Sequence, residues 1–314
     1  MQQADKPYLQ LALQPGTQYN CYVVAGNEGG LSMPSPTISA YLSPNAHAPM
    51  ALIIDAFDDV YGPQWFADSL HAGIVPGSYA CEDRITCAYI GEQWNYTRSS
   101  LWLNDDNCGW GACYRDHAGQ ITIGNTHDYS VLHGVVLRQA DISYVSTTGP
   151  MEQIDSTFTF VDVISGRNRM PLSPLALSPL ARYLSSGGRL LLSGDAMGSL
   201  DKEWAQTWLH CTPYADHATR SGLVLPKGQT RPFKILLSPN NLQLFSNTPH
   251  ALLPYGENAT RIAEYQDMRC PAAVGWHSAD HTGRTLVWGF PLEAAVHFEY
   301  VYRRSVEWLL QNEN

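Results

Sequence analysis

The stretch RLLLSGDAMGS, residues 189–199, decides how the fold is interpreted. Its leucines form a continuous apolar run, which is typical of a strand covered on both faces. The run enters a Gly-x-x-x-Gly turn between Gly194 and Gly198. In a nucleophile elbow the central position of such a turn carries serine or cysteine. Here that position is Ala196, whose methyl group cannot attack a substrate.

Similar apolar runs recur along the chain, with helical patterns between them. This alternation predicts an α/β domain with a largely parallel, doubly wound sheet. One helix ends with Gly187 as its C′ residue, one has Ser199 as its N-cap, and the last has Pro291 at N1. The expected strands are 51–57, 85–92, 142–148, 158–164, 189–194 and 284–290, and the expected helices include 131–140, 199–210 and 291–310.

The first 44 residues have a different character. Apolar and polar residues alternate between turn signals, which predicts two or three β-strands, one of them near 37–42. A sheet this small is marginal alone, so it must pack on the rest of the chain or end a truncated domain. The proline-bounded segment 45–50 is a linker, the α/β domain covers 51–314, and an irregular or short-stranded insertion lies near 212–270.

Composition excludes some function classes. The 314 residues carry a formal net charge of −10 and no basic cluster, so a nucleic acid would be repelled. No apolar run approaches the ~20 residues that span a bilayer, and the N-terminus lacks signal-peptide features. Of the seven cysteines, Cys81 with Cys87 and Cys108 with Cys113 form close pairs. Local disulfides and free thiols both remain open for them.

Two groups of motifs resemble known families. TQYNCYVVAGNEGGLSMPS, residues 17–35, resembles the last strands of a fibronectin type III domain. The remainder resembles the C-terminal module of secreted bacterial proteins named xanthan lyases, golvesin-like proteins or N-acetylmuramoyl-L-alanine amidases. The motifs are DAFDDVYGPQWF (55–66), YIGEQWNYTRSSLW (89–102), GWGACYRD (109–116), IGNTHDYSVLHG (123–134) and GFPLEA (289–294). This resemblance implies a flavodoxin-like fold, similar to class I glutamine amidotransferases, in an exported protein.

Carboxylates follow several of the expected strands. In a doubly wound sheet, ligands bind beyond the carboxyl ends of the strands. Side chains there could share a proton, bind a cation or hold sugar hydroxyls. The alternative is that they cap helices and accept bonds from loop amides. The residues are Asp55, Asp58, Glu92 and Asp195.

The segment GNTHDYSVLHG, residues 124–134, is the densest in polar groups. Asn125, Asp128 and His133 could form a general base and its supporting groups. Alternatively, Asn125 and Asp128 cap the helix and His133 is a core residue. His127 and His133 lack the one-turn spacing of helical zinc ligands, so no metal site is expected.

Aromatic and hydrogen-bonding side chains alternate in GEQWNYTRSSLWLNDDNCGWG, residues 91–111, which includes Trp110. Sugar rings offer apolar C–H faces and a rim of hydroxyls, so Trp94 and Trp102 with Glu92 and Arg98 suit a carbohydrate site. The same segment could instead close a lid over the sheet edge.

Two functions are consistent with these patterns. The first is an exported hydrolase acting on cell-envelope or extracellular glycans, such as peptidoglycan or an acidic polysaccharide, with His133 or Asp128 as general base. The second is a non-catalytic carbohydrate-binding or domain-organising module. Neither requires a cofactor, and the sequence leaves the oligomeric state open.

Overall fold

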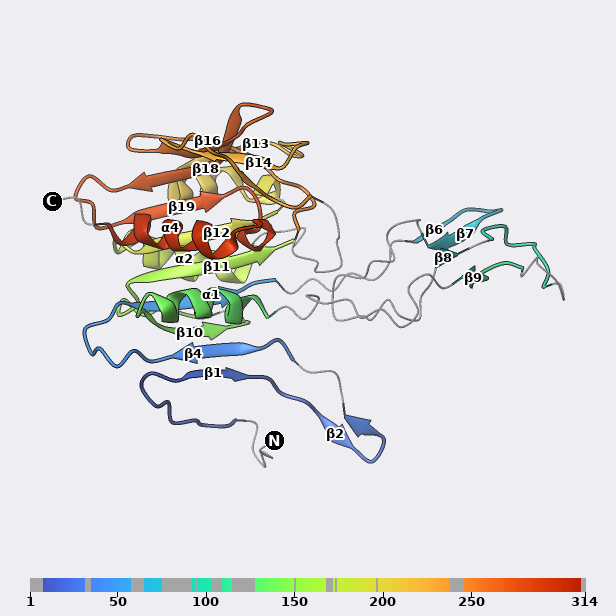
Figure 1. Cartoon of the computed structure of the whole chain (residues 1–314), viewed down its shortest axis with the longest axis horizontal. Helices are drawn as coiled ribbons and strands as arrows, with labels where there is room; N and C mark the ends of the chain where they lie inside the picture. Colours follow the sequence, from blue (N-terminus) through green and yellow to red (C-terminus); the bar gives the residue numbers. More distant parts are fainter. Residues whose placement is uncertain are drawn as a thin grey trace.

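One mixed sheet of 11 strands forms the centre of the molecule (Figure 1). The structure is a computed structural model, and it describes residues 8–31, 35–57, 65–74, 92–93, 95–102, 109–114, 128–149, 151–167, 172, 174–195, 197–237 and 245–311. In spatial order the strands are β1 (Gln18–Cys21), β4 (Ile38–Tyr41), β10 (Ser143–Thr147), β5 (Met50–Asp55), β11 (Phe160–Gly166), β12 (Arg189–Gly194), β19 (Arg284–Trp288), β18 (Cys270–His277), β17 (Thr260–Tyr265), β14 (Leu223–Pro226) and β15 (Phe233–Lys234).

The remaining elements are short ribbons and helices. The ribbons pair β2 (Gly26–Asn27) with β3 (Gly30–Leu31), β13 (Cys211–Ala215) with β16 (Ala251–Pro254), β6 (Trp65–Ala67) with β7 (Ala72–Ile74), and β8 (Glu92–Gln93) with β9 (Cys113–Tyr114). The helices are α1 (Tyr129–Gln139), α2 (Pro174–Ser185), α3 (Lys202–Trp204), α4 (Phe298–Leu310), the 3₁₀ turns η2 (Met197–Ser199) and η4 (Leu292–Ala294), and the π-helical turn η3 (Ala205–Leu209).

The prediction of a mostly parallel, doubly wound, flavodoxin-like sheet is wrong. Four neighbouring pairs run parallel, namely β10–β5, β5–β11, β11–β12 and β12–β19. Six run antiparallel, namely β1–β4, β4–β10, β18–β19, β17–β18, β14–β17 and β14–β15. The physical cause on one side is β18, an apolar strand that returns through a tight turn and pairs antiparallel with β19. A hairpin of this kind needs no crossover helix.

The N-terminal strands extend this same sheet. β1 pairs with β4, and β4 pairs with β10 through Tyr41 opposite Tyr144. A side-chain bond between Ser43 Oγ and Asp141 Oδ1, 2.6 Å long, ties the following segment to the end of α1. The division at 45–50 between a fibronectin type III fragment and a second domain stays a prediction, and backbone pairing crosses it.

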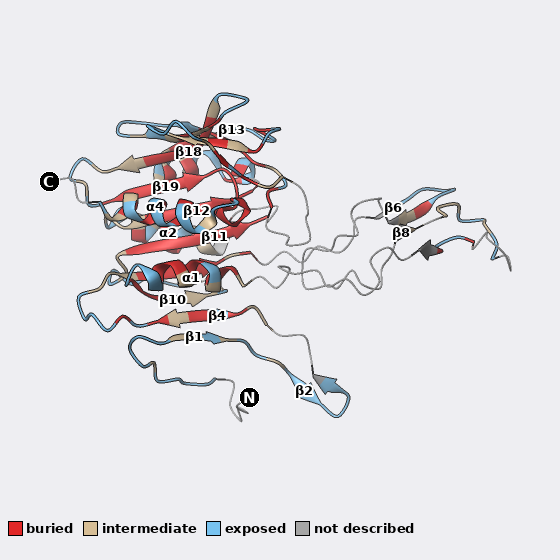
Figure 2. Cartoon of the chain, in the orientation of Figure 1, coloured by how far each residue is buried: buried red, intermediate tan, exposed pale blue. Residues whose placement is uncertain are grey.

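The core has two halves, one on each face of the sheet. Alternate residues of β5 illustrate the division, because Ala51 and Ile53 pack on one face and Leu52 and Ile54 on the other. Helices α1 and α4 cover the first face, and α2 with η3 covers the second (Figure 1). Figure 2 shows that the central strands are buried along most of their length. This double coverage explains why their sequences are continuous apolar runs.

Two helical predictions need correction. The segment after β12 is broken into η2, α3 and η3, and α3 is capped by Asp201, whose Oδ1 accepts a 2.8 Å bond from Trp204 N. Ser199 lies in η2 and does not cap α3. The last helix begins at Phe298, because the backbone is extended at Ala295 after η4. Gly187 has φ +83° two residues beyond α2, as its predicted place after the helix requires.

Two arginines close the C-terminal end of α4. Arg284 Nη1 donates a 3.0 Å bond to the carbonyl of Trp308, and Arg189 Nη1 donates a 2.9 Å bond to the carbonyl of Leu309. The two arginines are partners across β12 and β19. Carbonyls at a helix C-terminus carry partial negative charge and are stabilised by nearby cations. The arginines that begin these strands therefore fix α4 on the sheet.

We expect Arg284→Ala to lower the free energy of unfolding by about 2 kcal/mol. The side chain is buried, and its guanidinium also lies 5.3 Å from the centre of the Trp308 ring. Urea denaturation at pH 7 measures the change. Arg303→Ala, an exposed site on the same helix, is the control and should change stability by less than about 0.5 kcal/mol. Equal effects at both sites would contradict the cap.

None of the described helices has the length and apolar character of a membrane-spanning segment. Cys21, Cys211 and Cys270 are free thiols. Cys81, Cys87 and Cys108 lie outside the described residues, as does the side chain of Cys113, so both predicted pairings stay predictions.

Candidate functional site

The carboxyl edge of the parallel strands holds two of the predicted carboxylates. β5 lies between β10 and β11, so the chain changes direction across the sheet at this point, which is where open α/β sheets bind ligands. Asp55 ends β5 and is only 3% exposed, and its Oδ1 accepts a 3.3 Å bond from Phe57 N. Asp195 follows β12 and is fully buried.

Asp195 is held by the loop around Ser246. Its Oδ1 accepts a bond from Ser246 Oγ and its Oδ2 accepts one from Asn247 N, each 2.5 Å long. Burial raises the pKa of Asp195 to about 6, although these bonds and the charge of Arg167 act to lower it. Asp195 thus accepts bonds from a loop hydroxyl and a loop amide. Such bonds are the alternative to ligand binding that the sequence analysis gives for these carboxylates.

Arg167 lies beside Asp195 in a largely aromatic setting. Its guanidinium carbon is 5.2 Å from the centre of the Phe57 ring and 4.5 Å from that of Phe245. The residue is only 4% exposed. Gly194 lets the strands approach here, since a Cβ on it would lie 2.6 Å from Ser165 Cβ. The described part of this edge is therefore packed rather than open.

His133 occupies a second buried cluster, under α1 and α4. Its Nδ1 lies 2.6 Å from Asp162 Oδ2 and its Nε2 lies 2.9 Å from Glu293 Oε1. Tyr302 also donates a 2.6 Å bond to Asp162 Oδ2. The cluster joins α1, β11, η4 and α4, and the imidazole is fully buried.

The charge state of His133 is set by its neighbours. Burial alone would lower its pKa, but the Asp162 and Glu293 carboxylates outweigh burial and raise the pKa of His133 to about 10. The imidazole is therefore protonated at neutral pH, and a protonated imidazole must first lose a proton before it can act as a base. Its predicted role as general base stays a prediction, whereas its role in packing is defined by these contacts.

Among the residues that the structure describes, no other predicted site residue belongs to this cluster. Asp128 precedes α1, and its side chain makes no capping bond to the helix. Asn125, Asp58 and Trp94 lie outside the described residues, as does the side chain of Glu92. Asp162 and Glu293 were not among the predicted site residues. The one available signal for Asp162 was a charge inside an apolar strand, which a buried partner must compensate.

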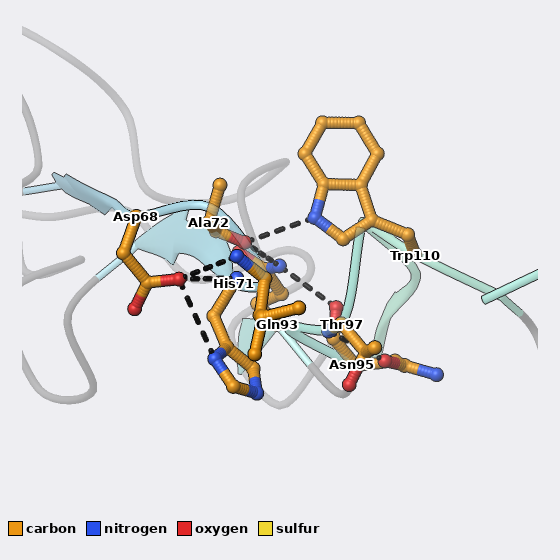
Figure 3. A network of polar contacts seen from close by, with 8 residues as sticks. Asp68, His71, Ala72, Gln93, Asn95, Thr97 and Trp110 are labelled. Atoms are coloured by element: carbon orange, nitrogen blue, oxygen red, sulfur yellow. Dashed lines mark hydrogen bonds and ion pairs between the residues drawn. The ribbon is translucent and has the colours of Figure 1, made fainter. Parts of the chain in front are cut away.

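A small lobe carries the described part of the predicted aromatic segment. It contains β6–β9 and residues 95–102 and 109–112, and Figure 1 draws it apart from the main sheet. Ala72 is the centre of its polar network (Figure 3). The carbonyl of Ala72 accepts a 3.0 Å bond from Gln93 Nε2 and another of 3.0 Å from Trp110 Nε1. Gln93 Nε2 also donates to the carbonyl of Asn95 over 2.8 Å.

Turn-forming side chains fix the loops of the lobe. Asp68 Oδ1 accepts bonds from the backbone of Leu70 and His71, and these bonds lower the pKa of Asp68. Asn95 Oδ1 accepts a 2.9 Å bond from Thr97 N. The backbone N–H of Arg98 donates to the carbonyl of Leu70 over 2.8 Å. The predicted residue Arg98 thus lies on a loop whose backbone is held by hydrogen bonds at Thr97 and at Arg98 itself.

Four large apolar side chains of the lobe are exposed. They are Leu70 at 65%, Leu101 at 77%, Trp102 at 71% and Trp110 at 43%, and we call them the indole surface. The two tryptophan segments touch at Gly109, where a Cβ would lie 2.9 Å from Trp102 N. Because all four lie on one small unit, they are candidates for contact with a ligand. Among the described residues, no group of His, Cys, Asp and Glu side chains could hold a metal ion.

No protein-family model matches this sequence, and no curated protein matches it either. Solved structures show distant likeness. An exo-β-1,4-mannosidase from Opitutaceae bacterium strain TAV5 is 12% identical over 64% of this chain and 34% of its own, with a TM-score of 0.43. The mmIFT52 N-terminal domain is 12% identical over 59% of this chain and 91% of its own, with a TM-score of 0.40. A β-galactosidase from the haloarchaeon Halorubrum lacusprofundi is 13% identical over 58% of this chain and 27% of its own, with a TM-score of 0.37. Likeness at this level carries no argument about function.

Proposed function

We propose that this chain is a glycan-binding module, and that its ligand lies on the indole surface. The observation that carries the proposal is the pair Trp102 and Trp110, exposed on a hydrogen-bonded frame. Indole faces pack against the C–H faces of sugar rings. A frame that is already ordered loses little conformational entropy when a ligand binds.

Binding is favoured over hydrolysis by the burial of His133, a predicted general base, and of Asp195, a carboxylate predicted to line the pocket. His133 is fully buried and protonated, and Asp195 is fully buried. A general acid or base must come within hydrogen-bond reach of the substrate. In the described parts of the chain, these two groups have no such access. We also propose that the protein is exported, because peptidoglycan and acidic polysaccharides lie outside the cytoplasm.

We expect Trp102→Ala and Trp110→Ala each to weaken binding to peptidoglycan fragments by about tenfold, which corresponds to ~1.4 kcal/mol for one lost stacking contact. Affinity electrophoresis and titration calorimetry measure the change. Tyr214→Ala is the matched control, because Tyr214 is 68% exposed but lies on β13 of the main body.

Circular dichroism of each variant separates lost binding from lost folding. Equal affinity in all three variants would contradict the indole surface. Release of soluble products by the wild-type chain would instead support the hydrolase.

A further inference from the structure

A groove of about 320 Å³ lies between α4 and the antiparallel strands of the main sheet. Helix α4 packs against β12 and β19, and the sheet continues past it through β18, β17 and β14. The flank of the helix and the turn after β14 form the two walls. The volume is within the range of small-molecule sites, about 300–1,000 Å³.

The floor of the groove is aromatic. Trp288 and Phe233 line it and are 4% and 9% exposed, while Trp308 is half-buried and Tyr300 is 55% exposed. Gly275 makes room for Trp308, because a Cβ there would lie 2.7 Å from Cζ2 of the indole. Trp288 is fixed by a 3.1 Å bond from its Nε1 to Ser305 Oγ. The floor is thus rigid, and Tyr300 presents an exposed ring at its side.

The rim carries more positive than negative charge. Its charged residues are Lys227, Arg304 and Glu307, and Arg304 Nη1 lies 2.9 Å from Glu307 Oε2. Among the residues that the structure describes, Lys227 forms no ion pair. The rim thus has an excess of one positive charge, two cations against one carboxylate, in a chain whose formal net charge is −10. Neutral hydrogen-bonding groups of Gln229, Thr260 and Gln311 complete the rim.

We propose that this groove binds an acidic saccharide through a uronate unit. The sugar ring packs on Tyr300 and Trp308, and its carboxylate pairs with Lys227 and Arg304. Aromatic faces suit the C–H face of the ring, and ammonium and guanidinium groups suit its carboxylate. The groove is separate in sequence from the indole surface, so this site does not depend on the proposed function of the lobe.

Titration calorimetry with tetragalacturonate at low salt tests the proposal, with the fully methyl-esterified tetramer as the uncharged match. We expect the acid to bind and the ester to bind at least tenfold more weakly. Added salt should weaken binding of the acid, because exposed charges are screened. Equal binding of acid and ester, or no binding of the acid, would overturn the proposal.

The variants place the ligand in the groove. Arg304→Gln is expected to weaken binding of the acid about tenfold, and Arg303→Gln, which removes the same charge at the next position, should leave it unchanged. Arg303 is directed to Gln139 of α1 instead, with a 2.9 Å bond. Tyr300→Ala should weaken the acid and the ester alike, since it removes stacking only.

Trp102→Ala should leave binding of the tetramer unchanged. If Trp102→Ala abolishes binding of the tetramer and Arg304→Gln does not, the uronate lies on the indole surface. This result would overturn the proposal for the groove and support the proposal for the lobe. Unchanged binding in both Arg304→Gln and Tyr300→Ala would also overturn the groove.

Discussion

Replacing His133 by alanine is expected to lower the free energy of unfolding by about 3–5 kcal/mol at neutral pH. The imidazolium lies between Asp162 and Glu293, 2.6 Å and 2.9 Å away, and all three side chains are almost fully buried. Removal of the cation leaves two carboxylates buried without their counter-charge, which costs far more than a surface pair would. Urea denaturation at pH 7 measures the loss. His47→Ala, at an exposed site, is the control.

The pH dependence gives a second, independent measure of the same cluster. The pKa of His133 is raised from 6.5 to about 10 in the folded protein. A group whose pKa is raised by folding stabilises the fold fully at pH values below its pKa in the unfolded chain. This contribution is lost as the pH rises through its pKa in the folded protein. Stability of the wild type should therefore fall between about pH 7 and 10, and His133→Gln should fall less steeply. Parallel pH profiles would contradict a protonated imidazole.

The sequence located the central strands well and the topology poorly. The apolar runs 51–57 and 284–290 correspond to β5 at Met50–Asp55 and β19 at Arg284–Trp288. A continuous apolar run reports burial on both faces, but it does not report the direction of the strand. β18 was missed because its run CPAAVGWH, residues 270–277, begins where the predicted insertion near 212–270 ends, and it was assigned to no strand. Its antiparallel pairing with β19 changes the class of the sheet.

The buried cluster shows the same limit for side chains. His133 was singled out from local polar density, yet its partners Asp162 and Glu293 are 29 and 160 positions away in the chain. Such pairs depend on the order of strands, which local patterns do not contain. Arg98, Trp102 and Trp110, in contrast, belong to one short region, so a local pattern can single them out together. Their role in ligand binding stays a prediction.

The free energy of unfolding of Asp195→Asn is expected to rise relative to that of the wild type as the pH is raised from 4 to 7. The change in this difference over the range is about 2–3 kcal/mol. Burial raises the pKa of Asp195 from 3.8 to about 6. The neutral form therefore contributes stability that is fully present below the unfolded pKa and is lost as the pH rises through 6. Asparagine stays neutral throughout, so it does not lose this contribution.

The substitution also preserves the hydrogen bonds of the neutral acid. A protonated Asp195 can donate to Ser246 Oγ while its other oxygen accepts from Asn247 N, and an asparagine amide can make the same two bonds. Denaturation at pH 4, 5, 6 and 7 measures the difference between the two proteins. A difference that stays constant with pH would show that the fold does not raise the pKa of Asp195.

Asp267→Asn is the matched control, with the opposite sign. Burial alone would raise the pKa of Asp267, but backbone bonds from Arg220 and Ser221 outweigh it and lower the pKa to about 2. A carboxyl whose pKa is lowered by folding stabilises the fold at pH values above its pKa in the unfolded chain. This contribution is lost as the pH falls through its pKa in the folded protein. The Asp267 variant should therefore lose stability relative to the wild type as the pH rises from 2 to 5. Opposite slopes at these two carboxylates would show that Asp195, in the turn after β12, is a buried acid whose pKa is raised by the fold.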